Sequence, residues 1–156
     1  MNLRKLLVSV TVCLGAASIG ALFTSQSVDG WYVVLQKPIF TPPNWLFGPV
    51  WTTLYIMMGI AFYFVWNQHC PGKQKTASYI LFAVQLLINI GWSAVFFGLR
   101  SISGGMFMII GLWVVIAATI HQFRQISTLA AWLLVPYLLW VSFAGLLNWG
   151  FWYLNK

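Results

Sequence analysis

The chain has 156 residues, of which 61% are hydrophobic and 6% carry a charge. Soluble domains carry charge on about a quarter of their residues, so this composition excludes an ordinary soluble protein and indicates an integral membrane protein. The formal net charge of +7 comes from basic residues scattered one or two at a time. Such a distribution forms no patch that would predict nucleic-acid binding.

Charged residues divide the sequence into five long uncharged intervals. A spanning helix needs about 20 apolar residues, so each interval is expected to hold one helix and none comfortably holds two. Short connections favour antiparallel neighbours. We therefore predict an all-α integral membrane bundle in one domain, with five transmembrane helices over residues 5–25, 46–67, 77–98, 105–123 and 130–153.

The first span follows a basic pair near the N-terminus, so a cleaved signal peptide is a competing interpretation. Its small residues favour a retained helix. Ala16 and Gly20 are spaced i, i+4, and so are Ala17 and Ala21. This spacing suits close packing against a neighbouring helix.

Residues 26–45 form a proline-rich connection that we predict to be a stiff lid over the bundle. Pro38, Pro42 and Pro43 lack an N–H and push the residue before them out of the α region, so this part is expected to be non-helical. Pro49 can lie in the first turn of the next helix, where its missing donor is harmless. The first half contains three residues expected to act as hinges, which are Asp29, Gly30 and Gln36.

The basic residues set an expected orientation. Five of the eight lie on the N-terminal side of the predicted bundle and three on the other, which favours a cytoplasmic N-terminus. The short tails suggest a bacterial membrane. Cys13 and Cys70 are too few and too far apart in sequence to predict a disulfide framework or a zinc site.

Asp29 is the only acidic residue of the chain. Proton-coupled pumps and cation exporters usually rely on an ionisable or negative group inside the bundle, and no carboxylate is present in the predicted spans. A Ser-His-Asp arrangement has no plausible geometry either. We therefore expect no conventional catalysis.

Aromatic residues are abundant instead, with ten Trp, six Tyr and twelve Phe. Most can belong to interfacial belts and packing, to which we assign Trp31, Trp132, Trp149 and Trp152. Others share helix faces and could form a ligand surface. These stripes are Trp51, Tyr55, Met58 and Phe62 on the second span, and Tyr137, Trp140, Ala144 and Asn148 on the fifth.

The third span carries the sharpest polar pattern, because Gln85, Asn89, Trp92 and Ser93 share one helix face. Amide side chains at membrane depth avoid lipid. They can form interhelical hydrogen bonds, worth roughly 0.6 to 2 kcal/mol, or supply the few polar groups of an apolar small-molecule site. The sequence favours the two interpretations about evenly.

His69 and His121 follow or end the second and fourth spans, which finish on the same side of an antiparallel bundle. This placement permits a haem held by two histidines. Interfacial histidines with hydrated rings are more common, so a haem-holding membrane subunit is the alternative rather than the leading hypothesis.

Several multi-residue motifs follow one another along nearly the whole chain. They are Trp31-Tyr32, Lys37-Pro38-x-Phe40-x-Pro42-Pro43-x-Trp45, Gly48-Pro49-Val50-Trp51-Thr52-x-Leu54-Tyr55, Gln85-x3-Asn89-x2-Trp92 with Phe96-Phe97-Gly98, and Pro136-Tyr137-Leu138-x-Trp140 with Phe143-Ala144 and Leu147-Asn148. In order and spacing they resemble the tryptophan-rich sensory protein family (TspO/MBR), which includes the mitochondrial translocator protein or peripheral benzodiazepine receptor.

The resemblance implies a five-helix fold, usually dimeric, with a pocket under the first loop. In the family this pocket binds porphyrins and other tetrapyrroles, lipophilic drugs and, in animals, cholesterol. Trp51 and Trp140 match two tryptophans associated with light-dependent porphyrin breakdown in bacterial relatives. The implied ligand-binding positions are Tyr32, Pro42, Trp51, Asn89, Trp140, Ala144 and Leu147.

The chain departs from the family pattern at Phe40, where many members carry Trp, and at Ile90, where animal members have the first Trp of Trp-x-Trp. We expect a sensor or translocator with no tightly bound cofactor and a protoporphyrin IX-like porphyrin as ligand. Lipophilic molecules and membrane lipids are the other expected partners. A homodimer is expected through the small-residue face Ala94-x3-Gly98.

A lipid or sterol transporter is a further alternative. The stretch Leu147-x5-Tyr153-x2-Lys156 satisfies the loose cholesterol-recognition pattern. Such patterns are weak, and the composition of an interfacial helix end explains this one equally well.

Overall fold

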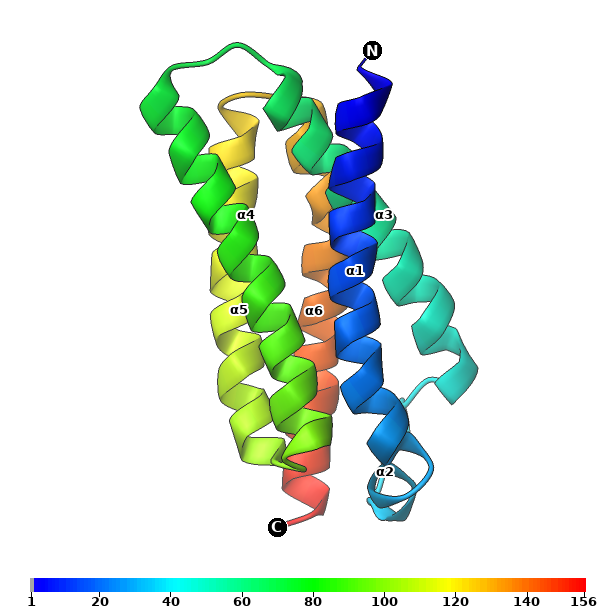
Figure 1. The fold of residues 1–156 in the computed structure, drawn as a ribbon. Coiled ribbons are helices and arrows are strands. Elements are labelled where there is room, and N and C mark those ends of the chain that lie inside the picture. Colours follow the sequence, from blue (N-terminus) through cyan, green and yellow to red (C-terminus); the bar gives the residue numbers. More distant parts are fainter. Residues whose placement is uncertain (1) are drawn as a thin grey trace.

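The structure is a computed structural model that describes residues 2–156. The chain is 85% helical, and five of its helices are long and apolar enough to cross a membrane (Figure 1). The predicted all-α bundle of five spans is therefore confirmed. In chain order the elements are α1 (Leu3–Val28), α2 (Trp31–Val34), α3 (Asn44–Asn67), α4 (Gly72–Ser93), the π-helical η1 (Ala94–Gly98), α5 (Ile102–Arg124) and α6 (Thr128–Leu154).

Each predicted span lies inside an observed helix, but the third begins at Gly72 rather than at residue 77. Lys73 and Lys75 suggested a loop, whereas both lie in the first turn of α4 after Pro71. Long lysine side chains tolerate such positions because they extend their ammonium groups into water at the membrane surface. The positions of the charged residues therefore predicted where the apolar stretch begins, but not where the helix begins.

The five long helices form a closed ring. Helix α1 packs on α3 and α4, helix α5 packs on α4 and α6, and α6 completes the ring against α3 (Figure 1). The largest side chains fully buried inside the ring include Tyr137, Phe123, Met58 and Leu112. A second, smaller cluster of buried residues lies near the α2 end, where Tyr32, Phe96 and Phe151 belong to it.

Small residues bring α1 close to its neighbours, as predicted for a retained helix. A Cβ added to Gly20 would lie 3.3 Å from the Ser93 Oγ atom of α4, and one added to Gly59 of α3 would lie 2.7 Å from the Cα atom of Val10. Ala16 is also buried. These contacts let backbones approach where larger side chains would separate the helices.

Helix α4 continues into the π-helical turn η1, which the sequence analysis did not predict. Its consecutive residues Phe96 and Phe97 are both buried. The Ser27 hydroxyl donates a 2.7 Å hydrogen bond to the Phe97 carbonyl and so ties η1 to α1. Single π turns of this kind are frequent at functional sites.

The proline-rich connection is pinned to the end of α6. The Gln36 N–H donates to Asn155 Oδ1, and Asn155 Nδ2 donates to the Gln36 carbonyl, each over 2.9 Å. A Cβ on Gly150 would lie 2.5 Å from Cγ of Pro38, so the proline ring fits against a bare helix face. Both backbone polar groups of Gln36 are therefore bound in this structure, and the hinge expected there stays a prediction.

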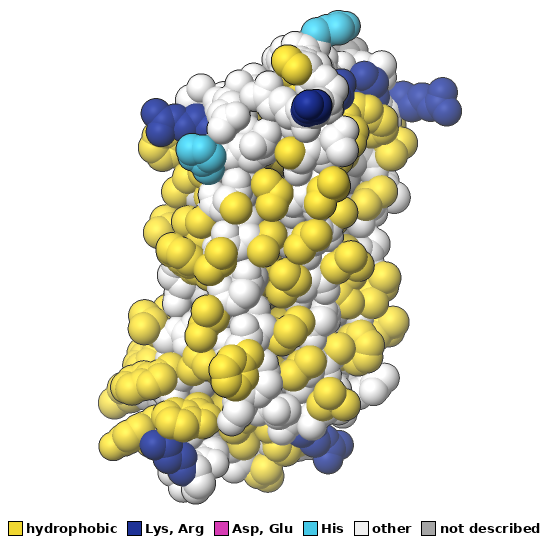
Figure 2. All heavy atoms as spheres, turned by 90° about the vertical axis from the view of Figure 1, so that its left-hand side faces the viewer, with side chains coloured by type: hydrophobic (Ala, Val, Ile, Leu, Met, Phe, Trp, Pro, Cys, Tyr) yellow, Lys and Arg dark blue, Asp and Glu magenta, His cyan; other side chains and the backbone are white. Residues whose placement is uncertain are grey.

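Figure 2 shows a broad band of hydrophobic side chains with Lys and Arg gathered at the two ends of the molecule. This distribution fits a bundle whose middle faces hydrocarbon and whose ends face water. Trp132, Trp149 and Trp152 are exposed, as expected for an interfacial belt, whereas Trp31 packs edge-on against Phe96 at 5.6 Å. The cytoplasmic location of the N-terminus stays a prediction.

Candidate ligand-binding cavity

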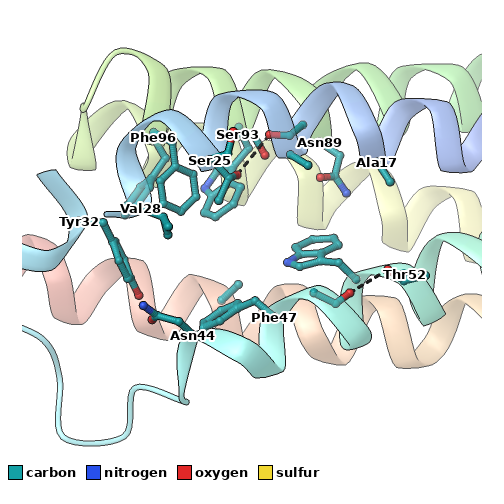
Figure 3. A pocket seen from close by; sticks show the side chains of 18 of the residues that line it. Ala17, Ser25, Val28, Tyr32, Asn44, Phe47, Thr52, Asn89, Ser93 and Phe96 are labelled. Atoms are coloured by element: carbon teal, nitrogen blue, oxygen red, sulfur yellow. Dashed lines mark hydrogen bonds between the residues drawn. The ribbon is translucent and has the colours of Figure 1, made fainter. Parts of the chain in front are cut away.

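A cavity of about 700 Å³ lies inside the ring at the α2 end (Figure 3). Its walls come from α1, α3, α4 with η1, and α6, and Tyr32 of α2 closes its loop end. Among the described residues that line it, none carries a charge. Cavities of roughly 300–1,000 Å³ with mostly apolar walls are typical small-molecule sites.

Five of the seven positions implied by the resemblance line this cavity, and they come from four separate helices: Tyr32, Trp51, Asn89, Ala144 and Leu147. Pro42 and Trp140 do not line it. Trp140 packs behind a cavity residue, Phe47, with ring centroids 6.0 Å apart in an edge-on arrangement. Helical spacing predicted that Trp140 lies on the cavity side of α6, but it could not show that the Phe47 ring packs there against Trp140.

Aromatic rings form most of the rigid wall. Trp51 lies 5.9 Å from Tyr55 and 6.3 Å from Tyr137, and Trp92 stacks on Phe96 with centroids 5.3 Å apart and planes 19° from parallel. Edge-on and offset contacts of this kind fix each ring in place. The cavity therefore offers preformed π surfaces to a flat ligand.

On the polar face predicted for the third span, Gln85, Asn89 and Ser93 are buried. Asn89 Nδ2 donates a 2.6 Å hydrogen bond to the Tyr137 hydroxyl, which joins α4 to α6. The same Asn89 side chain lines the cavity (Figure 3), as do Trp92 and Ser93. Gln85 lies one turn farther from the cavity and does not line it.

Several buried polar atoms have no hydrogen-bond partner within the described residues. They include both amide atoms of Gln85 and the indole N–H groups of Trp92 and Trp140. An unpaired polar group in an apolar interior costs roughly 2–7 kcal/mol relative to water, depending on the reference state. The Trp92 ring borders the cavity, but its indole nitrogen is buried and does not face it.

Hydroxyl groups line the α1 and α3 walls, but their protons are already used. Ser18, Ser25 and Thr52 each donate to a carbonyl of their own helix, at 2.9, 3.1 and 2.9 Å. What remains toward the cavity is the oxygen as an acceptor. These walls therefore favour an apolar ligand that carries N–H or O–H groups over one that offers only acceptors.

The cavity opens sideways between α1 and α3. Ser18, Ala21 and Ser25 of α1 and Gly48 and Thr52 of α3 line the cavity and are also exposed on the surface. The two helices diverge toward the α2 end in Figure 1. Since α1 and α3 are both long and apolar enough to cross a membrane, the opening faces the place where lipid would lie.

The loop end of the cavity carries the nearest cation. Tyr32 is buried against Phe97 and Phe151, with ring centroids 5.7 and 5.4 Å apart, and Lys37 Nζ lies 4.5 Å from the Tyr32 ring centroid. Burial raises the pKa of the Tyr32 hydroxyl, so this group stays protonated and can donate a hydrogen bond. Figure 3 shows Tyr32 and Asn44 together at this end.

Residues that the sequence analysis missed come mainly from α1 and from the α3 residue Phe47. On α1 the signal was present, because small and hydroxyl residues recur every three or four positions at Ala17, Ala21 and Thr24, all of which line the cavity. We expected Ala17 and Ala21 to pack against a helix. A small residue leaves room equally for a neighbouring helix or for a cavity, so the pattern alone does not separate the two outcomes.

The two histidines lie outside the cavity. His69 and His121 are both exposed, and Figure 2 shows the histidines at the same end of the molecule, as predicted from helix direction. The His121 Nε2 atom is 3.2 Å from the Gln125 Nε2 atom. No group of three or more His, Cys, Asp or Glu side chains suited to a metal ion is found among residues 2–156.

The three defining residues of the cholesterol-recognition pattern do not share a surface. Leu147 faces the cavity and is 5% exposed, whereas Tyr153 is 61% exposed and stacks on Trp149. Lys156 Nζ lies 4.0 Å from the Trp152 ring centroid. The pattern therefore follows the composition of the α6 end and forms no single docking face.

Taken together, the fold and the cavity define a class: a multi-pass helical membrane protein with an apolar small-molecule cavity between its spans. The TspO/MBR family model matches residues 9–154. The chain belongs to the TspO/MBR family, as the motifs predicted.

Curated relatives match over nearly their full length. The chain is 43% identical over 147 residues to "Tryptophan-rich protein TspO" of Chlorobaculum tepidum, covering 94% of this chain and 93% of the relative. It is 41% identical over 155 residues to "Tryptophan-rich protein TspO" of Archaeoglobus fulgidus, covering 99% of each. It is 39% identical over 142 residues to the human "Translocator protein", covering 88% of this chain and 84% of that protein.

Proposed function

We propose that the protein binds a porphyrin or a related flat tetrapyrrole in its cavity and acts as a membrane sensor or translocator for it. The observation that carries this proposal is the aromatic, uncharged cavity of about 700 Å³ with one lysine just outside its loop end. A porphyrin likewise has a large uncharged aromatic part and a few charged groups at its edge. Its broad π face gains from stacking and burial, while its carboxylates require a cation or water.

The orientation of the bound ligand follows from these groups. The macrocycle lies against Trp51 and Trp92, because these rings border the cavity and are held by neighbouring aromatics. The propionates point toward Lys37, since burying a carboxylate in the uncharged interior would be costly.

Transport or sensing, rather than conventional catalysis, suits the lateral opening between α1 and α3. A lipophilic ligand can exchange with the bilayer through it without crossing the pinned proline-rich connection. Light-dependent porphyrin breakdown at Trp51 remains compatible with this proposal because Trp51 borders the cavity. Trp140 can take part only after Phe47 moves.

The test is a titration of the purified protein with protoporphyrin IX, followed by tryptophan fluorescence. We expect saturable quenching, and Trp51→Phe should weaken binding about 2- to 12-fold if the lost indole contact is worth roughly 0.5–1.5 kcal/mol. Trp132→Phe is the matched control, because Trp132 is 66% exposed on the outer surface. Equal affinities in all three proteins would contradict the assignment of the cavity.

The same preparation separates the histidine alternative. A haem held by His69 and His121 would give a stoichiometric iron Soret band that His121→Ala abolishes. The cavity proposal expects porphyrin binding that is unchanged by His121→Ala, since neither histidine borders the cavity.

A further inference from the structure

The basic residues of this chain have almost no acidic partners. Asp29 is the only Asp or Glu beside eight Lys and Arg residues, and it follows the C-terminal end of α1. Basic side chains gather at the opposite end, which carries the N-terminus (Figure 2). Five belong to this end by chain position: Arg4, Lys5, Lys73, Lys75 and Arg124. Their counter-ions must therefore come from outside the protein.

Two of these five side chains are engaged internally. Lys5 Nζ lies 5.6 Å from the Trp66 ring centroid, and Lys75 Nζ donates a 3.2 Å hydrogen bond to the Gln68 carbonyl. The Arg124 guanidinium is exposed and makes no hydrogen bond or ion pair with the described residues. Unlike Arg4 and Lys73, it lines a groove between α5 and α6 on the surface of the bundle.

The groove has a volume of about 270 Å³ and lies between the end of α5 and the start of α6. Arg124 and Ile120 are one turn apart on α5, and on α6 the lining residues extend from Thr128 to Val135. The groove thus leads from a cation at the water boundary along apolar side chains toward the middle of the bundle. The remaining lining residues are Ala131 and Trp132.

The groove walls match the parts of a lipid. Ala131 is 4% exposed and, being small, leaves the floor open, while Trp132 stands beside it at 66% exposure. Tryptophan at such a depth is typical of the headgroup boundary. The exposed Thr128 hydroxyl adds a second polar group at the arginine end.

We propose that this groove binds one anionic glycerophospholipid, with its phosphate on Arg124 and an acyl chain along Ile120, Ala131 and Val135. A guanidinium presents a planar pair of donors that fits phosphate oxygens. A zwitterionic lipid brings its own cation to the same place. An anionic lipid supplies the negative charge that this end of the protein lacks. The charge of Arg124 therefore favours an anionic headgroup, and the apolar part of the groove accommodates an acyl chain.

The experiment is native mass spectrometry of the whole protein in detergent with equal amounts of dioleoylphosphatidylglycerol and dioleoylphosphatidylcholine. The wild type should retain phosphatidylglycerol preferentially. Arg124→Gln should retain about fivefold less of it, the effect of one basic residue near an anionic lipid surface. Lys73→Gln is the matched control, since it removes one charge from the same end but does not line this groove.

A second measurement locates the lipid. Phosphatidylglycerol with a photoreactive acyl chain should cross-link residues 120–135 in the wild type and in Lys73→Gln, and much less in Arg124→Gln. Ala131→Leu should reduce cross-linking without changing charge, because it fills the floor. Equal retention by Arg124→Gln and Lys73→Gln, or cross-links spread evenly over the lipid-facing helices, would overturn the proposal. Far-UV circular dichroism shows that each variant is folded.

Discussion

Asn89 shows how one side chain can serve both the fold and the site. Its amide nitrogen binds the Tyr137 hydroxyl at 2.6 Å, so it is held between α4 and α6 within the bundle. The side chain also borders the cavity, where a held amide keeps its remaining acceptor in a fixed direction. A polar group that is already positioned gives orientation to a ligand at little further entropic cost.

At the same scale, Phe47 lines the cavity and packs edge-on against Trp140, which does not line it. Phe47 lies in the first turns of α3, just before Pro49, which has no N–H to bind the carbonyl of Trp45. This part of the helix is therefore held less firmly than its middle, and the Phe47 ring can leave its edge-on contact with Trp140.

We predict that Phe47→Ala speeds light-driven loss of bound protoporphyrin IX, because it opens the space between the ligand and Trp140. The measurement is porphyrin absorbance under constant illumination at saturating protein. The gain should disappear in Phe47→Ala/Trp140→Phe, while Phe47→Leu, which keeps most of the barrier, should resemble the wild type. If the gain persists without Trp140, Phe47 limits the reaction in some other way.

At the scale of whole elements, the sequence predicted the features that depend on hydrophobicity and missed those that depend on tertiary contacts. Apolar intervals located all five spans, because a membrane helix must satisfy its own backbone. The π turn at Ala94–Gly98 was not predicted, since Ser27 of another helix binds its Phe97 carbonyl. The clamp between Gln36 and Asn155 joins residues 119 positions apart, which no local pattern reveals.

The residues of the candidate site were also predicted only in part from the sequence. The resemblance named Trp51, Asn89 and Ala144 correctly as neighbours of one cavity. It could not show that Phe47 packs against Trp140 or that Pro42 does not line the cavity. A helix face or a loop motif indicates which way a side chain points, but not which other side chains lie between it and the cavity.

The same clamp makes a prediction about the proline-rich connection. The side chain of Asn155 holds the Gln36 backbone by two hydrogen bonds, so Asn155→Ala should loosen the lid. Limited proteolysis reports this opening. In a Gln36→Lys background, which keeps both backbone bonds, we expect trypsin to cleave after residue 36 faster when Asn155 is replaced. Ligand should slow cleavage in both proteins if the connection covers the occupied cavity.

Lys156→Ala is the matched control for this clamp, because Lys156 contacts Trp152 and Tyr153 rather than the loop. Cleavage as slow in Asn155→Ala as in Lys156→Ala would show that Pro38 against Gly150 is sufficient to hold the lid.

For the whole molecule, the exposed apolar side chains of the long helices bear on assembly. The predicted dimer used Ala94 and Gly98, but a Cβ on Gly98 would lie 3.2 Å from the Phe23 ring of its own chain. Gly98→Leu would therefore disturb the monomer and cannot test the dimer cleanly. Farther along α4, Ile80 and Leu87 are 57% and 67% exposed and lie two turns apart on one face.

We predict a homodimer in which this α4 face meets its counterpart, as the family resemblance suggested for this helix. Leu87→Cys in a Cys70→Ser background should form an intermolecular disulfide in the bilayer, because the two-fold axis of a homodimer places equivalent residues near each other. The remaining Cys13 is fully buried and should not react. Val114→Cys on α5, 55% exposed, is the control that should stay monomeric. Equal cross-linking at both positions would indicate random collision, and cross-linking only at Val114 would move the interface to α5.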